Sequence, residues 1–134
     1  MTSCFVALPP GAALQECFDV LARGITAAGL DPLLAWELDR PRAFEQIHQG
    51  VENAAACIVD FTNRGQVPLY VFGLAQGSRK PVITVAQDPS HLPFDIRVRK
   101  HIIYRYRGPR WQDMLSMQVH SALRDLIASP AAPR

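Results

Sequence analysis

The sequence lacks the motifs that would place it at once in a common functional class. It contains no glycine-rich phosphate loop of the GxGxxG or GxxxxGK type. Its 3 cysteines, Cys4, Cys17 and Cys57, are odd in number and far apart, so we expect neither a disulfide framework nor a cysteine metal site. Its 4 histidines show no metal-ligand spacing, and we interpret them as structural or surface residues. We therefore predict no metal and no cofactor.

Long apolar runs and a strong charge bias are also missing. No apolar run approaches the roughly 18 residues that a membrane-spanning helix needs. The chain shows no basic start followed by an apolar leader, so we expect a cytoplasmic protein with no membrane partner. The formal net charge is only +2, which argues against nucleic acid as a partner.

Positive charge is concentrated in one stretch of the sequence, around His101 and before the last helix. This stretch contains Arg97, Arg99, Lys100, Arg105, Arg107 and Arg110. It fits either a solvated rim beside the last strand or a site for phosphate or another anion.

Apolar segments of two kinds alternate along the chain. Short apolar runs at residues 4–8, 32–38, 56–60, 82–86 and 102–104 predict strands, and helical spacing predicts helices at 14–25, 44–54, 68–77 and 111–126. We expect Gly77 to form a helix C-cap, and Gly73 with Ala75 and Gly77 to allow close packing of that helix on the sheet. We predict a single domain over residues 1–128 and a disordered tail at 129–134.

This alternation predicts an α/β fold of three layers, flavodoxin-like (Rossmann-like), with a five-stranded parallel sheet in the order 2-1-3-4-5. In that order the loops at 8–11 and 60–66 face each other across the switch point. Trp36 and Glu37 then lie beside this crevice, at the end of the second strand. Asp60 ends an apolar strand that is buried on both faces, at the edge where such sheets bind ligands.

Several motifs occur in an order that is typical of one enzyme superfamily. They are FVALP (5–9), AGL (28–30), AACIVDFT (55–62), Tyr70 with GLA (73–75), KPVI (80–83) and LPFDIR (92–97). Together they resemble the nucleoside 2-deoxyribosyltransferase-like superfamily, which is related to TIR domains. The resemblance covers roughly residues 4–104.

The resemblance implies a site for an N-glycosidic ligand, with departures in the catalytic segment. Asp60 and Thr62 match the family pattern. The position of the family's catalytic glutamate, directly after Tyr70, holds Val71, and the family's Asn-Pro-Asn turn is replaced by Gly65-Gln66-Val67. Cleavage of the bond between sugar and base needs a carboxylate near the anomeric carbon, and valine cannot supply one. Removal of such a nucleophile typically costs on the order of 10^4 to 10^6 in rate.

We predict a set of ligand contacts around the switch point. The set is Leu8, Pro9, Trp36, Asp60, Thr62, Asn63, Tyr70, Asp95 and Arg97. Structural alternatives remain open for several of these residues. Asp60 could instead cap the next turn through the Thr62 and Asn63 amides. Asp95 and Arg97 could form a local brace, and Tyr70 could be a core or rim residue.

Three functional hypotheses follow. The first is a domain that binds a nucleoside, nucleotide or related ribosyl ligand, with its glycosidic chemistry weakened or lost, as in a pseudoenzyme. The second is an active N-glycosidase or deoxyribosyltransferase in which Asp60, Glu37 or Asp39 supplies the carboxylate. The third is a structural or interaction module that forms homo-oligomers.

Overall fold

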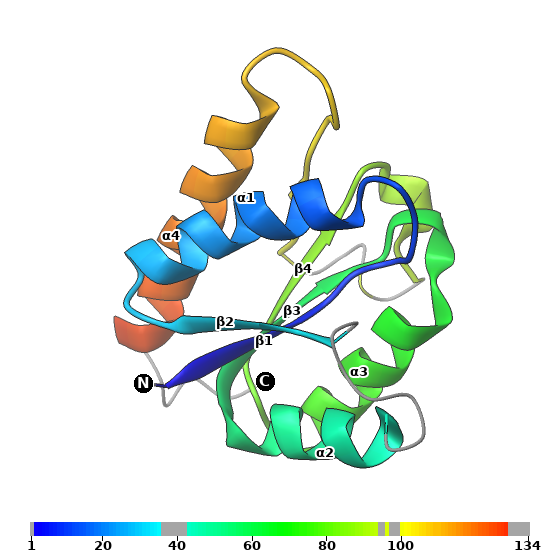
Figure 1. Cartoon of the computed structure of the whole chain (residues 1–134), viewed down its shortest axis with the longest axis vertical. Helices are drawn as coiled ribbons and strands as arrows, with labels where there is room; N and C mark the ends of the chain where they lie inside the picture. Colours follow the sequence, from blue (N-terminus) through cyan, green and yellow to red (C-terminus); the bar gives the residue numbers. More distant parts are fainter. Residues whose placement is uncertain (1, 36–42, 94–95, 97–99, 129–134) are drawn as a thin grey trace.

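The computed structural model describes residues 2–35, 43–93, 96 and 100–128 (Figure 1). A five-stranded sheet forms the centre of the domain. Its strands are β1 (Ser3–Ala7), β2 (Asp31–Leu34), β3 (Ala54–Asp60), β4 (Val82–Ala86) and β5 (Ile102–Ile103). Every neighbouring pair is parallel and the order is β2-β1-β3-β4-β5, so the predicted class and topology are confirmed.

Four helices cover the two faces of this sheet. They are α1 (Leu14–Ala27), α2 (Ala43–Asn53), α3 (Gln66–Gly77) and α4 (Trp111–Ala128). Two short 3-10 turns, η3 (Thr62–Arg64) and η4 (Pro89–His91), follow β3 and β4. Helices α1 and α4 pack on one face and α2 and α3 on the other, which gives the three layers visible in Figure 1.

The core is divided by the sheet into two apolar clusters, because successive side chains of a strand point to opposite faces. On β1, Cys4 and Val6 belong to the cluster under α1 and α4, whereas Phe5 and Ala7 belong to the cluster under α2 and α3. β3 alternates in the same way. Burial on both faces explains why these strands are nearly continuous apolar runs.

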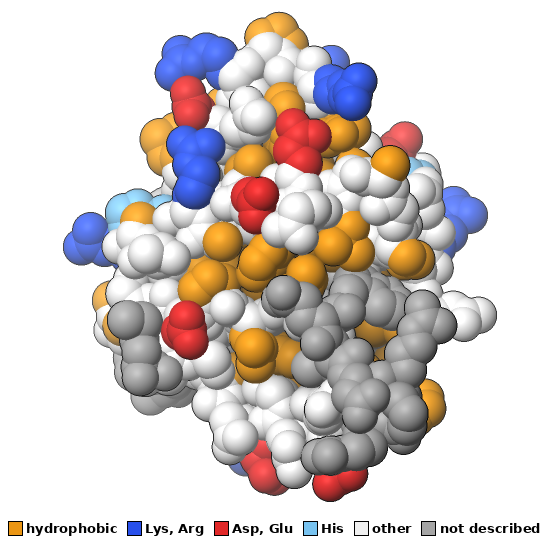
Figure 2. Space-filling view, in the orientation of Figure 1, with side chains coloured by type: hydrophobic (Ala, Val, Ile, Leu, Met, Phe, Trp, Pro, Cys, Tyr) orange, Lys and Arg blue, Asp and Glu red, His pale blue; other side chains and the backbone are white. Residues whose placement is uncertain are grey.

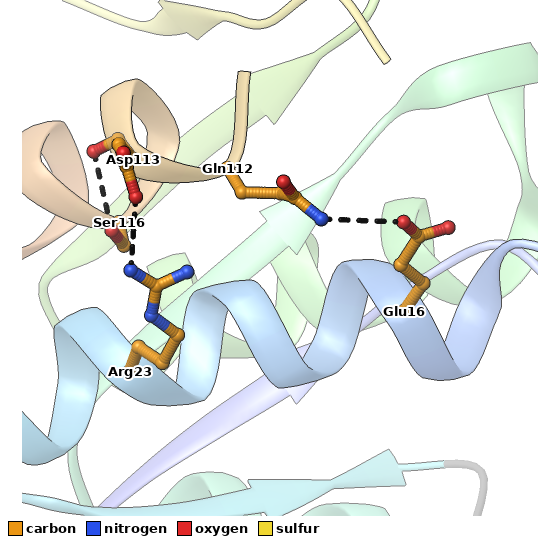
Figure 3. Close-up of polar contacts among 5 residues, drawn as sticks. All are labelled: Glu16, Arg23, Gln112, Asp113 and Ser116. Carbon is orange, nitrogen blue, oxygen red and sulfur yellow. Dashed lines mark hydrogen bonds and ion pairs between the residues drawn. The ribbon is translucent and has the colours of Figure 1, made fainter. Parts of the chain in front are cut away.

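Helices α1 and α4 approach each other closely at Gly24. A Cβ atom at this position would lie 2.5 Å from the backbone oxygen of Ser116, so only glycine fits. Polar contacts flank this apolar seam (Figure 3). Arg23 Nη2 donates to Asp113 Oδ1 over 3.1 Å, and Gln112 Nε2 donates to Glu16 Oε2 over 3.5 Å. The seam fixes α4, and with it the chain that leads into α4, against α1.

Two expectations about glycines in α3 are wrong. Gly77 is the last residue of the helix rather than its cap, and the left-handed conformation that follows belongs to Arg79, with φ 59°. A Cβ at Gly73 or Gly77 would meet nothing within 4 Å, so neither residue mediates close packing. The close approach on this face occurs at Gly50 of α2, where a Cβ would lie 2.4 Å from the Phe5 ring.

The element bounds otherwise differ from the prediction by a few residues. Helix α3 begins at Gln66, two residues before Pro68, and β5 ends at Ile103. The predicted tail at 129–134 and the predicted end of the second strand lie outside the described residues. Among the residues described, no helix combines the length and the apolar character needed to span a bilayer.

Candidate functional site

The switch point of the sheet lies between β1 and β3, as predicted. The two loops that leave these strands meet there, because a Cβ at Gly65 would lie 3.8 Å from Pro9 Cβ. Leu8 is buried at the end of β1, and Pro9 is half-buried. The loops therefore form one continuous edge at the carboxyl ends of the two strands, which is where open α/β sheets bind ligands.

Asp60 is buried at this edge, with 1% of its surface exposed. Its Oδ1 accepts a hydrogen bond from the Thr62 amide over 2.9 Å, as in the turn-capping alternative. Its Oδ2 accepts a hydrogen bond from the Tyr104 hydroxyl over 2.6 Å. Both carboxylate oxygens are thus engaged within the protein, so the carboxylate braces the end of β3.

Tyr104 connects Asp60 to three other elements. Its hydroxyl lies 3.7 Å from Cys17 Sγ in α1 and accepts from Gln87 Nε2 over 3.3 Å, just after β4. Its ring stacks on Trp111 at the start of α4, with centroids 6.0 Å apart. The backbone amide of Gln87 also donates to Thr62 Oγ1 over 3.0 Å. A single polar network therefore joins the ends of β3, β4 and β5 to α1.

Burial controls the protonation of this network. Removal from water raises the pKa of Asp60 above its usual range, although the hydrogen bonds from Thr62 and Tyr104 act in the opposite direction. Burial, with the nearby Asp60 charge, also raises the pKa of Tyr104. Burial likewise raises the pKa of the Cys17 thiol, so this cysteine is not an activated nucleophile.

The loop after β3 holds two consecutive non-glycine residues in the left-handed region, Asn63 with φ 61° and Arg64 with φ 55°. Contacts with η4 hold this conformation. The Asn63 amide donates to His91 Nδ1 over 3.2 Å, and Arg64 Nη2 donates to the Ser90 carbonyl over 3.0 Å. Such conformations cost about 1–3 kcal/mol each and are concentrated at functional sites.

Val71 and Tyr70 of α3 have different surroundings from the Asp60 network. Val71 is fully buried in the apolar cluster that also contains Ala7, Ala35 and Phe61. Tyr70 is 39% exposed and lies against α2, where its hydroxyl is 2.6 Å from His48 Nε2. No hydrogen bond among the described residues joins Tyr70 to Asp60.

The structure brings only part of the predicted set together. Asp60, Thr62 and Asn63 are adjacent to Leu8 and Pro9 across the switch point. Trp36, Glu37, Asp39, Asp95 and Arg97 lie outside the described residues. Sequence reasoning missed Tyr104 as the partner of Asp60, and Gln87 and Cys17 as contacts of Tyr104, because contacts between residues 17 to 87 positions apart leave no periodic signal.

Two hollows lie away from the switch point. One of about 450 Å3 is lined by residues of α2, of α3 and of the position just after α3, namely Phe44, Glu45, His48, Gln49, Glu52, Leu74 and Ser78. The other, of about 680 Å3, is lined by residues of α3, β4, β5 and α4 and by Lys100 and His101. Among the described residues there is no group of three or more His, Cys, Asp or Glu side chains that could hold a metal ion.

Comparisons with known proteins agree with this architecture. A 2-deoxyribosyltransferase from Leishmania mexicana superposes with a TM-score of 0.51 and 12% identity. The match covers 64% of this chain and 65% of that chain, slightly less than two thirds of its length. The chain has a deoxyribosyltransferase-like fold. This confirms the fold that the sequence motifs of the nucleoside 2-deoxyribosyltransferase-like superfamily implied.

A second structural match limits what the fold can say about function. A 3-dehydroquinate dehydratase-like protein from Bifidobacterium longum matches with a TM-score of 0.54 and 17% identity, over 95% of this chain and 98% of that one. Neither a protein-family model nor a curated protein sequence matches the chain. Because both structural matches have low identity, they establish the fold alone, and function has to be argued from the site.

Proposed function

We propose that the protein binds a nucleotide, or a related nucleoside or ribosyl compound, at the carboxyl ends of β1 and β3, with N-glycosidic cleavage weakened or lost. The observation that carries the proposal is the meeting of two loops at the switch point, where a strained and braced turn presents the exposed Asn63. An asparagine amide can both donate to and accept from sugar hydroxyls or base edges.

The helix ends at this edge favour a ligand that carries phosphate. Helices α1 and α3 both begin next to the switch point, and neither receives a side-chain cap at its N-terminus. The first-turn amides of a helix bind anions well when no side chain occupies them. Two such termini beside the switch point support a nucleotide over a nucleoside.

The expected loss of chemistry rests on the acids of the catalytic segment. The resemblance assigns the nucleophile position to Val71, which is buried in apolar surroundings. Asp60, the acid of the described residues in this segment, has both oxygens engaged by Thr62 and Tyr104. An oxocarbenium-like transition state would find no free carboxylate on these residues.

The first test is binding measured by calorimetry, with chromatographic detection of free base in parallel. Deoxynucleosides, nucleoside monophosphates and NAD are the probes. We expect a nucleotide to bind more tightly than its nucleoside, and no base to be released. Release of base by the wild-type protein would overturn the loss of chemistry, and no binding of any probe would overturn the proposal.

A matched pair of variants tests the place of binding. Asn63→Gly removes an exposed side chain and keeps a residue that tolerates φ 61°. Arg79→Gly does the same at φ 59°, at the other end of α3. We expect Asn63→Gly to raise the dissociation constant about tenfold, which is the effect of losing one hydrogen bond to the ligand. Equal effects of the two variants would contradict this location.

A further inference from the structure

We propose that the protein associates head to tail, with a loop rich in arginine on one copy docking against the exposed face of α2 on the next copy. The arginine loop comprises residues 105–110 and carries Arg105, Arg107 and Arg110. The α2 face comprises Phe44, Glu45, His48 and Glu52. This contact is separate from the switch point and does not depend on the proposed ligand.

The arginine loop has a defined shape. Its backbone forms two consecutive turns, in which the Gly108 amide donates to the Arg105 carbonyl over 2.8 Å and the Trp111 amide to the Gly108 carbonyl over 3.2 Å. Arg107 and Arg110 hold φ values of 66° and 58°, and the Arg107 guanidinium lies 5.4 Å from the centre of the Tyr106 ring. Arg105, Arg107 and Arg110 are all exposed, so a firmly folded loop presents three cations to solvent.

The α2 face offers the complementary chemistry. Glu45, His48 and Glu52 are exposed and lie three and four residues apart, on one side of the helix. Phe44 is 69% exposed and packs edge-on against Tyr70. A hollow of about 450 Å3 lies between these residues and the end of α3. Two carboxylates beside an exposed aromatic ring suit a guanidinium, which pairs with carboxylates and stacks on aromatic faces.

Within the part of the chain that the structure describes, the charges of these two surfaces form no ion pair, although Arg107 also interacts with Tyr106 and Glu16. Among the described residues the one ion pair is Arg23 with Asp113 in the α1–α4 seam. None of the three loop arginines, nor Glu45 or Glu52, takes part in it. Both surfaces therefore present charges that a partner of opposite sign can pair.

The two surfaces lie at opposite ends of the molecule. Figure 1 places α2 at the bottom of the long axis and the loop before α4 at the top. Figure 2 shows basic side chains around the top end, with acidic ones among them, and acidic side chains at the bottom edge. One chain cannot bring its own loop to its own α2, but a second copy in the same orientation can. A heterologous contact of this kind builds open chains or closed rings.

Sedimentation velocity of the full chain tests the contact. We expect an average mass above the 14.9 kDa of one chain that rises with concentration and falls in about 0.5 M salt, because exposed charges are screened. Arg105→Gln with Arg110→Gln removes the loop charges, and Glu45→Gln with Glu52→Gln removes the α2 charges. Each double variant alone should stay monomeric.

The decisive sample is an equimolar mixture of these two variants. Each contributes one intact surface, so the mixture should form a 1:1 dimer and nothing larger. Lys100→Gln with Arg124→Gln, two exposed cations elsewhere, gives the same net charge as the loop variant and should associate like wild type. Circular dichroism checks that every variant is folded. A monomeric wild type, a mixture without dimers, or equal loss in the control would each overturn the proposal.

Discussion

At the scale of single residues, Asp60 organises the candidate site from a buried position. A carboxylate is costly to bury unless its oxygens are hydrogen-bonded, and here the Thr62 amide and the Tyr104 hydroxyl satisfy both of them. The residue that the family resemblance marks as functional is therefore also a structural brace. Its removal would affect the loop that carries Asn63 as well as any ligand.

Tyr104→Phe should destabilise the fold more than Tyr106→Phe does. The first change leaves Asp60 Oδ2 buried without its donor, which costs about 1–3 kcal/mol in the free energy of unfolding. The second removes a hydroxyl that donates to Glu16 Oε1 over 2.8 Å in a partly buried setting, where water can replace it. Urea unfolding at pH 7 measures both variants. An equal decrease in the free energy of unfolding for both variants would show that the hydrogen bond to Asp60 stabilises the fold no more than the one to Glu16.

Asp60→Asn should change how stability depends on pH. Burial raises the folded-state pKa of Asp60, so the folded protein holds this proton to a higher pH than the unfolded chain, whose aspartates titrate near about 3.9. The contribution of Asp60 to stability is thus full below that value and decreases as pH rises through the folded pKa. Asparagine removes the titration and keeps an acceptor for Thr62.

Urea unfolding of wild type and Asp60→Asn between pH 4 and pH 8 checks this linkage. The stability of the variant relative to wild type should increase as pH rises from about 4, and then become constant. A difference that stays the same at every pH, or that decreases as pH rises, would contradict the raised pKa.

At the scale of the elements, glycines allow two helices to approach their neighbours closely. Helix α1 reaches the backbone of α4 at Gly24, and α2 reaches the Phe5 ring at Gly50. Helix α3 has no such contact at Gly73 or Gly77. The pairing of α1 with α4 matters for the site because Tyr104 stacks on the first residue of α4 and contacts Cys17 of α1.

Gly24→Ala and Gly73→Ala should have opposite effects on stability. The new methyl at position 24 would lie 2.5 Å from the Ser116 carbonyl oxygen, a backbone atom that cannot move alone, so we expect a loss of about 1–3 kcal/mol. The methyl at position 73 meets nothing within 4 Å, and alanine favours a helix by about 0.5–1 kcal/mol. Thermal unfolding measures both. A stable Gly24→Ala variant would mean that the α1–α4 seam can open.

At the scale of the whole molecule, the fold allows several functions and the surface has to distinguish them. One architecture matches both a deoxyribosyltransferase and a dehydratase-like protein, so topology alone assigns no chemistry. The relevant features of this chain are the apolar burial of Val71, the braced loop after β3, and the exposed arginines before α4 together with the exposed glutamates of α2. The head-to-tail proposal follows from the last feature and the nucleotide proposal from the second.

The sequence by itself determined the layers and the order of the sheet. Apolar runs at β1 and β3 can be satisfied only by burial on both faces, and alternation with helices then requires a parallel sheet with right-handed crossovers. The same reasoning placed Asp60 at the carboxyl end of β3 and the loops after β1 and β3 opposite each other. These features depend on local pattern, which a single chain displays in full.

Only the tertiary structure decided what these residues contact. Tyr104 and Asp60 are 44 positions apart, and their hydrogen bond depends on β4 lying between β3 and β5 and on α4 packing against α1. The close approach at Gly24 and the placement of the arginine loop opposite α2 depend on the same assembly of elements. Contacts of this kind arise from the relative positions of whole elements, and no spacing within one segment encodes them.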